Sequence, residues 1–365
     1  MTQRILLVQL RQLGDILLTT PCLSALRQAW PEAEIVFLSH PMGRLILKDN
    51  PHLSELVTYD PGAGWRAEWA LARQLRARRF DLVFDFMNNP RSAFYTRMTG
   101  AACRLGFASA RSWAYTQAPR KPTTEDYIVR HKFMLLQAAG VASGSEQLIL
   151  PWPAAAADDV ADFFAATPAL KAAPLRILLS PTHRRPLRRW PLARYAALAD
   201  RLSSEWGAAV VWLHGPGEAA VIDEVQGLCR QPSYKAPPTS FAQMSALMAN
   251  MDLFIGNSNG PSHVAVAANL PSLQLHGHTS AVAWCPMNER HQALQTPEYG
   301  QVRVPRIEAL TLEVVWSKLA SMRPTLERIA AARPKEALRR DWDVSGLVSV
   351  TYFSAKPVVR PIALE

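Results

Sequence analysis

Residues 251–277, MDLFIGNSNGPSHVAVAANLPSLQLHG, have the pattern of a strand, a turn, a helix and a second strand in uninterrupted order. Residues 253–256 are a short apolar run, residues 257–260 have turn-forming composition, and Pro261 suits the first position of a helix. Extended structure resumes at residues 272–275. This order predicts a βαβ unit, the building block of parallel sheets.

The turn of this unit has the features of a phosphate-binding loop. A helix that begins here points backbone N–H groups and the positive end of its dipole at the loop. Gly256 and Gly260 would let the backbone approach a ligand closely. A purely structural helix start explains the same residues, so the loop alone leaves both interpretations open.

Apolar runs alternate with helical patterns along the rest of the chain. Strands are expected at residues 4–10, 34–38, 56–59, 80–86, 176–180 and 209–213, and helices at 65–79, 154–166, 195–206 and 218–229. Ser240 and Gln243 match a capping box that opens a further helix before residue 251. The alternation predicts an α/β fold with doubly wound parallel sheets.

The length of 365 residues predicts two domains, because one hydrophobic core usually stops growing below that size. The boundary is expected in the proline-flanked connector at residues 168–174. The expected parts are a first domain at 1–165, a second domain at 175–305, a helix at 306–330 that returns to pack on the first domain, and a tail at 331–365 without an assigned role. Within the tail, residues 347–353 alternate like an added strand.

The chain carries a net charge of +10 with a pI near 9.7, which favours nucleic acid, an anionic membrane surface or a phosphorylated substrate as partner. Its four cysteines are widely separated, without the spacing of a metal site or a disulfide framework. The first 20 residues have the pattern of a strand and not of a signal peptide, and no run of 18 apolar residues occurs. We expect a cytoplasmic protein, free or resting on the inner face of a membrane.

Two further segments contain charged residues at positions where a ligand could bind. Asp15 follows the first strand at Gly14, either as a helix cap or as a carboxylate at the edge where open α/β sheets bind ligands. Four arginines fall within residues 184–189, directly after a strand, which suits the mouth of a phosphate pocket. Arginines also recur over residues 66–111; those up to residue 79 suit a solvated helix face, whereas those beyond residue 86 lie in a loop-rich region where an anion could dock.

Four segments, in this order, resemble the motifs of glycosyltransferase family 9, the bacterial heptosyltransferases of lipopolysaccharide core assembly. Residues 10–21 resemble R-x-x-G-D followed by an apolar pair and T-x-P, and residues 188–191 resemble K-x-W-P with Arg188 at the Lys position. Residues 215–218 match a G-x-G-E loop. Residues 256–263 resemble G-N-D-[ST]-G-P-x-H, with Ser258 replacing the Asp and Asn259 replacing the hydroxyl residue.

The resemblance implies a GT-B fold, two Rossmann-like doubly wound domains facing each other across a cleft, with the acceptor on the first domain and the donor on the second. It implies an inverting transfer, without a metal or other cofactor, of heptose from a nucleotide-sugar donor, ADP-heptose, to an anionic glycolipid acceptor at the inner membrane surface. Asp15 is then the general base that deprotonates the acceptor. The acceptor-binding residues are expected to be Arg11, Gly14, Arg91 and Arg97, and the donor-binding residues Thr182, Arg188, Gly215, Ser258, Asn259, Gly260 and His263.

The sequence also leaves other functions open. The change at Ser258 is compatible with a different donor sugar in surface polysaccharide synthesis. A dinucleotide-dependent oxidoreductase would need G-x-G-x-x-G after the first strand, which residues 10–15 lack. A non-catalytic module for an anionic ligand explains the charge but gives Asp15 no role, and no nucleic-acid-binding motif is present. His276 and His278 lack a third metal ligand nearby in the sequence.

Overall fold

The computed structural model describes residues 3–332, 338–340 and 342, and their contacts divide the chain into two compact units. Unit 1 ends at Ile149 and unit 2 begins at Leu150. This division lies ahead of the expected connector, because helix α7 (Ala154–Ala166) packs on α11 (Phe241–Met248) of unit 2. The helix that the sequence assigned to the end of the first domain is therefore the first helix of unit 2.

Unit 1 is built on a five-stranded parallel sheet in the order β3-β2-β1-β4-β5. The strands are β1 (Arg4–Val8), β2 (Glu34–Ser39), β3 (Glu55–Thr58), β4 (Leu82–Asp85) and β5 (Cys103–Gly106). The helices are α1 (Leu13–Leu17), α2 (Thr20–Ala29), η1 (Pro41–Gly43), α3 (Arg44–Leu47), α4 (Gly64–Ala77), α5 (Pro90–Thr99), η2 (Ser112–Ala114) and α6 (Ile128–Ala138). Val8 lies level with Leu38 and Asp85, so the three central strands end together.

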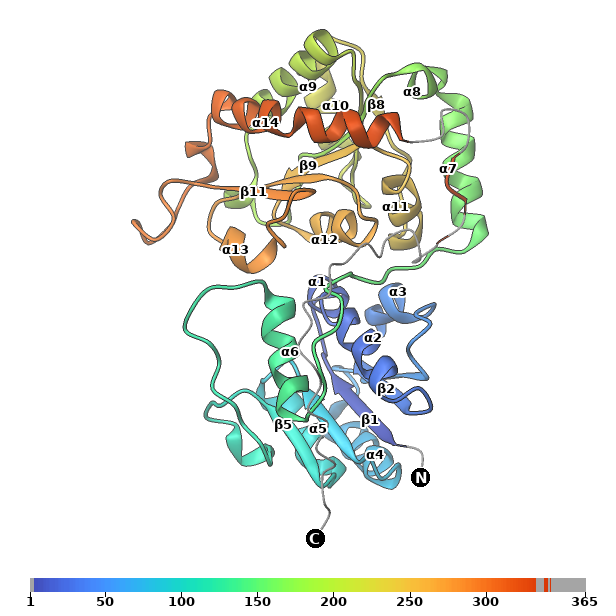
Figure 1. The fold of residues 1–365 in the computed structure, drawn as a ribbon, viewed down its shortest axis with the longest axis vertical. Coiled ribbons are helices and arrows are strands. Elements are labelled where there is room, and N and C mark those ends of the chain that lie inside the picture. Colours follow the sequence, from blue (N-terminus) through green and yellow to red (C-terminus); the bar gives the residue numbers. More distant parts are fainter. Residues whose placement is uncertain (1–2, 333–337, 341, 343–365) are drawn as a thin grey trace. The chain divides into compact units, whose positions relative to one another are not determined.

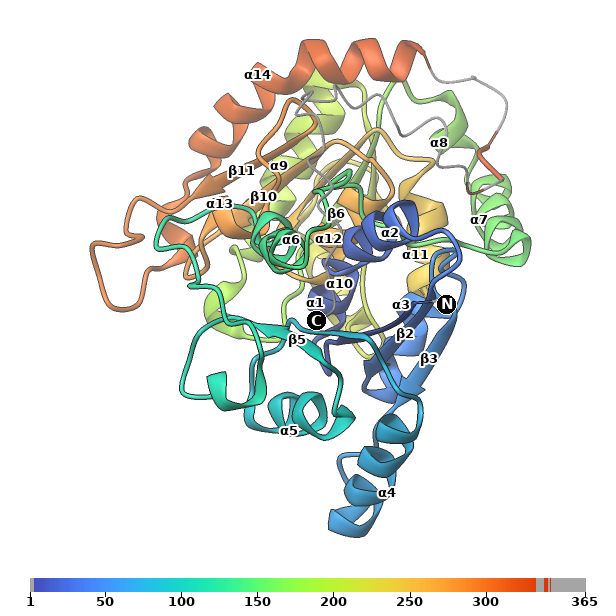
Figure 2. The same cartoon turned by 60° about the horizontal axis from the view of Figure 1, so that its bottom comes forward.

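The sheet of unit 1 is covered on both faces, as the continuous apolar runs of its strands require. Leu6 and Val8 point to one face, where they pack with Leu75 of α4 and Tyr95 of α5. Helices α2 and α6 contact each other and cover the opposite face (Figure 2). Burial on both faces is the arrangement of a doubly wound sheet.

Unit 2 is built on a six-stranded parallel sheet in the order β11-β10-β9-β6-β7-β8. The strands are β6 (Arg176–Ser180), β7 (Ala209–Trp212), β8 (Tyr234–Lys235), β9 (Leu253–Asn257), β10 (Ser272–His276) and β11 (His291–Gln295). Besides α7 and α11, the helices are α8 (Pro168–Ala172), η3 (Pro186–Arg188), α9 (Leu192–Trp206), α10 (Ala219–Leu228), α12 (Gly260–Ala267), α13 (Ala281–Trp284), η4 (Ile307–Ala309) and α14 (Leu312–Ala331). Numbered within the unit, this strand order is the 3-2-1-4-5-6 order of the Rossmann fold.

Helix α14 belongs to the core of unit 2. It lies with α9 and α10 on one side of the sheet, whereas α11 and α12 lie on the other (Figure 1). Its Val315, Leu319 and Leu326 are buried in one cluster with Ile177 and Ile255 of the sheet. This late helix, which was expected to pack on the first domain, therefore contributes its apolar face to the core of unit 2. The strand expected at residues 347–353 lies outside the described residues.

Candidate functional site

The strand order of unit 2 creates a switch point between β6 and β9. These neighbours pair in parallel, with Ser180 level with Gly256, but the chain leaves them toward opposite sides of the sheet. In open α/β sheets, ligands bind in the crevice at the carboxyl ends of such strands. The arginine loop, residues 181–190, follows β6, and the signature loop, residues 258–260, follows β9. Both predicted donor segments therefore emerge at the same point.

Asn257, the last residue of β9, holds the two loops together. It is fully buried, and its Oδ1 accepts a 3.0 Å hydrogen bond from the backbone N–H of Trp190. Its Nδ2 donates to the carbonyl oxygens of Pro181 at 3.1 Å and Thr182 at 3.3 Å. Asn259 adds a 3.0 Å bond from its own Nδ2 to the Thr182 carbonyl. The backbone of both loops is fixed by side chains of the signature itself.

The arginine loop has a large excess of positive charge. Among the described residues, none of its arginines, Arg184, Arg185, Arg188 and Arg189, forms an ion pair with a carboxylate. Burial lowers the pKa of Arg188, and the neighbouring charges of Arg185 and Arg184 lower it further. An anion bound here would relieve this repulsion and gain charge-assisted hydrogen bonds.

Two histidines of unit 2 are buried close to this charge. Burial lowers the pKa of His263, in the first half of α12, to about 4. Its ring lies 5.9 Å from that of Trp284, and its Nδ1 has no hydrogen-bond partner among the described residues. The pKa of His276 is lowered to about 3, chiefly by burial and in smaller part by the neighbouring His263 and Arg188. These rings are neutral at physiological pH, and His263 retains a free hydrogen-bonding atom.

The remaining predicted donor residues lie at the same edge. Gly215 follows β7, which neighbours β6, and its backbone N–H donates a 2.8 Å bond to the Glu218 side chain. The hydroxyl of Ser258 accepts a 3.2 Å bond from Thr279. Gly260 begins α12 and has open space around its Cα. All seven predicted donor residues thus follow the carboxyl ends of three adjacent strands, β9, β6 and β7.

In unit 1, Asp15 lies in the first turn of α1, next to the end of β1 and partly buried. Burial raises the pKa of its carboxyl group, whereas the positive charge of Lys132 and a hydrogen bond from the backbone N–H of Gln12 lower it. The Gly14 carbonyl accepts a 2.9 Å bond from the Leu18 backbone within the same turn. Asp15 therefore sits where an apolar environment makes a carboxylate more basic, which suits a general base.

A cavity of about 280 Å³ opens beside this turn. It is lined by Arg11, Gln12, Leu13, Ile16, His40, Met42, Gly43, Tyr59 and Pro61. His40 and Tyr59 directly follow β2 and β3, and their rings meet edge to face at 5.9 Å. Neither residue was predicted from the sequence, although the position of each directly after a predicted strand was a usable signal.

The structure separates two arginines that the sequence had grouped. The segment expected to be loop-rich contains helix α5, which a capping box of Asn89 and Ser92 opens. Arg91 in its first turn pairs with Glu68 at 2.9 Å and lies over the cavity residue Tyr59 at 5.6 Å. Arg97 lies six residues further along α5, about 9 Å along its axis, toward the amino ends of the strands. Arg91 therefore lies at the same edge of the sheet as Asp15, and Arg97 does not.

Comparison with known proteins identifies the family of this fold. The sequence profile of glycosyltransferase family 9 (heptosyltransferase) matches residues 68–309. The chain belongs to this family. A lipopolysaccharide heptosyltransferase 3 of Escherichia coli is 26% identical over 305 residues, which cover 79% of this family 9 chain and 88% of the relative. The lipopolysaccharide core heptosyltransferase OpsX of Haemophilus influenzae is 20% identical over 77% of this chain and 81% of its own.

Solved structures agree on the fold of this family 9 member. A glycosyltransferase family 9 protein from Veillonella parvula has a TM-score of 0.79 at 21% identity, covering 90% of this chain and 98% of its own. The E. coli heptosyltransferase WaaC with ADP has a TM-score of 0.68 at 17% identity, covering 88% and 100%. The fold is of the GT-B type, two doubly wound α/β units, as the motif resemblance implied.

Proposed function

We propose that this family 9 glycosyltransferase moves a heptose from ADP-heptose to a lipopolysaccharide core acceptor with inversion and without a metal. Unit 2 binds the donor and unit 1 binds the acceptor. The observation that supports the donor assignment is the charge of the arginine loop at the β6–β9 switch point. Arg188 has other arginines as neighbours, and among the residues that the structure describes it forms no ion pair with a carboxylate. A diphosphate supplies the missing negative charge.

In the proposed reaction, the carboxylate of Asp15 takes the proton of an acceptor hydroxyl as its oxygen attacks the anomeric carbon of the donor. The bond from that carbon to the diphosphate oxygen breaks, and its electron pair leaves with the nucleotide. Attack on the face opposite the leaving group inverts the anomeric centre. Arg188 and the N–H groups at the start of α12 stabilise the negative charge that grows on the diphosphate, the role a metal ion plays elsewhere.

The acceptor is proposed to be an anionic glycolipid at the inner membrane surface. Arg11 and Arg91 frame the cavity beside Asp15 and would contact its acidic groups. Among the described residues, no helix combines the length and apolarity needed to span a bilayer. We propose that the enzyme acts from the cytoplasmic side and reaches its substrate peripherally.

Thermal-shift titration with ADP, UDP, GDP and ADP-heptose tests the donor assignment. ADP and ADP-heptose should stabilise the protein selectively, and Arg188→Ala should abolish that stabilisation. The matched control is Arg201→Ala on α9, which removes an arginine already paired with Glu205 and Glu313. A preference for another nucleotide would leave the proposed transferase activity in place and change the proposed donor, in line with the Ser258 substitution. The absence of stabilisation by every nucleotide would contradict the proposal.

A further inference from the structure

A buried lysine in unit 1 takes no direct part in the proposed transfer reaction. Lys132 lies on α6 with a side chain that is buried to 5% exposure. Its Nζ donates hydrogen bonds to Oγ1 of Thr19 at 2.9 Å and to Oε1 of Gln9 at 3.1 Å, and it lies 5.1 Å from the ring of Phe86. A lysine is rarely buried to this degree unless it is paired.

The two hydrogen-bond partners of Lys132 hold both ends of the Asp15 turn. The amide Nε2 of Gln9 donates a 2.7 Å bond to the carbonyl oxygen of Arg11. The hydroxyl of Thr19 donates a 2.7 Å bond to the carbonyl oxygen of Asp15 itself. One ammonium group therefore connects, through two side chains, to the first and last residues of the segment 11–15. Because these bonds hold the backbone of residues 11–15 in place, they also determine the position from which the Asp15 side chain extends.

The charge of Lys132 needs its own explanation, because an uncharged side chain could fill the same space. Burial lowers the pKa of Lys132, and Asp15 opposes this most strongly, followed by Cys22 and Asp85. Burial raises the pKa of the Cys22 thiol to about 12, so that group is neutral. The remaining candidate for the partner charge is one of the two carboxylates.

Asp85 already has a complete set of hydrogen-bond donors. Its carboxylate accepts 2.8 Å bonds from the hydroxyls of Tyr115 and Ser92 and bonds of 3.0 and 2.9 Å from the backbone N–H groups of Met87 and Asn88. The carboxyl of Asp15 has a single backbone donor, Gln12, among the causes that lower its pKa. Asp15 therefore depends on the lysine charge more than Asp85 does.

We propose that Lys132 is a positioning residue for Asp15, holding its turn and keeping its carboxylate ionised inside an apolar setting. This inference rests on the proposed role of Asp15 as the base. Without the cation, the desolvated carboxyl would take up a proton more readily and lose its capacity to accept the acceptor's proton. The base would then be inactive over part of the physiological pH range.

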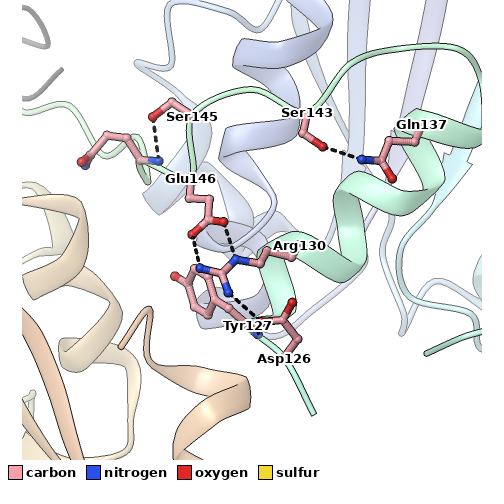
Figure 3. Close-up of polar contacts among 8 residues, drawn as sticks. Asp126, Tyr127, Arg130, Gln137, Ser143, Ser145 and Glu146 are labelled. Atoms are coloured by element: carbon pink, nitrogen blue, oxygen red, sulfur yellow. Dashed lines mark hydrogen bonds and ion pairs between the residues drawn. The ribbon is translucent and has the colours of Figure 1, made fainter. Parts of the chain in front are cut away.

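Two substitutions separate the charge from the hydrogen bonds. Lys132→Met removes both, whereas Lys132→Gln keeps an amide that can bond Gln9 and Thr19 but carries no charge. The matched control is Arg130→Gln on the same helix. Arg130 pairs with Asp126, before α6, at 2.7 Å and with Glu146, after α6, at 2.5 Å, so it holds the segments that flank this helix and not the Asp15 turn (Figure 3).

The pH profile of kcat/KM is the deciding measurement, with ADP-heptose as donor and core oligosaccharides carrying no, one or two heptoses as acceptors. In Lys132→Met and Lys132→Gln, the acidic limb should move to higher pH, with a loss of about tenfold at pH 6 that shrinks as the pH rises. The KM for the donor should not change, and Arg130→Gln should keep the wild-type profile. An equal loss at every pH, with an unmoved limb, would reduce Lys132 to a structural residue and overturn the proposal.

A titration without substrate gives an independent test on the full chain. The carboxyl resonances of ¹³C-labelled aspartates are followed against pH in wild type and Lys132→Gln, and Asp15→Asn assigns the signal of interest. The Asp15 resonance should titrate at higher pH in Lys132→Gln, and an unchanged midpoint would overturn the inference. If Asp15→Asn retains activity, the proposed base is wrong; if it is inactive while Lys132→Gln matches wild type, only the lysine inference fails.

Discussion

The backbone N–H of Trp190 donates a 3.0 Å hydrogen bond to Oδ1 of Asn257, although 67 residues separate the two. This bond joins the end of the arginine loop to the end of β9, so the two predicted donor loops form one hydrogen-bonded structure. The Trp190 ring is fully buried, and its Nε1 bonds the Leu310 carbonyl at 2.7 Å. The arginine loop is thereby anchored in the core of unit 2.

Replacing Asn257 by Ala should loosen this structure. The substitution leaves the Trp190 N–H and the Pro181 carbonyl without their partner, at a cost of about 1–3 kcal/mol for each buried group left unpaired. The Thr182 carbonyl loses one of its two donors and keeps Asn259. Urea denaturation should show a lower midpoint, and ADP should bind more weakly. Asn259→Ala, which removes a single loop-to-loop bond, should cost less. Equal stability of the two variants would argue against Asn257 as the main link.

Asp15→Asn should abolish transfer but leave nucleotide binding intact. A positioned general base contributes about 10²–10⁴-fold to the rate, and the amide cannot take the proton. Turnover is measured as ADP release from ADP-heptose, and binding as the thermal shift with ADP. Asp81→Asn is the matched control, because its carboxylate bonds the Arg4 backbone at the opposite end of the sheet. Retained turnover in Asp15→Asn would remove Asp15 from the mechanism.

Much of the fold follows from local pattern. The strands β1 and β6 lie within the predicted ranges, and β9 extends one residue beyond its range, to Asn257. The capping box of Ser240 and Gln243 is present with bonds of 2.8 and 3.3 Å. These features depend on residues close in the sequence. The carboxyl-edge rule then predicts that the proposed donor residues follow adjacent strands, because a parallel sheet aligns the ends of its strands.

The parts that the sequence did not reveal depend on distant contacts. Lys132 meets Thr19 across 113 residues, and no local pattern marks that contact. Helix α5 was missed because its residues lack a clear amphipathic period, and its capping box needed Ser92 to act as the second partner of Asn89. Arg97 was grouped with Arg91 for the same reason, since only the helix separates them.

The two arginines of α5 give a direct test of the acceptor site. Arg91→Ala should raise the KM for the core acceptor by about tenfold, the effect of losing one charge-assisted contact, without changing nucleotide binding. Arg97→Ala removes an equal charge from the same helix and should leave the KM unchanged. The KM for the core acceptor is measured for both variants by steady-state kinetics at a fixed donor concentration. Equal effects of both substitutions would indicate a general charge effect and not a site beside Tyr59.

Buried histidines should make unit 2 sensitive to acid. Burial lowers the pKa of His276 and of His291 to about 3 in the folded protein, below the ordinary value of 6.5. Between these values the unfolded chain binds a proton that the folded chain does not, so acid favours unfolding. The stabilisation is complete above pH 6.5 and is lost as the pH falls toward 3. Each histidine should contribute a slope of about 1.4 kcal/mol per pH unit within that window.

His291→Gln isolates one of these contributions. The free energy of unfolding is measured by urea titration between pH 7.5 and pH 4.5, with tryptophan fluorescence as the signal, because Trp190 and Trp212 are fully buried in unit 2. The variant should show a flatter pH dependence than wild type, and the double variant with His276→Gln should be flatter by about the same amount again. Parallel pH profiles of wild type and both variants would show that these rings do not take up protons on unfolding, and would place the acid sensitivity in the carboxylates instead.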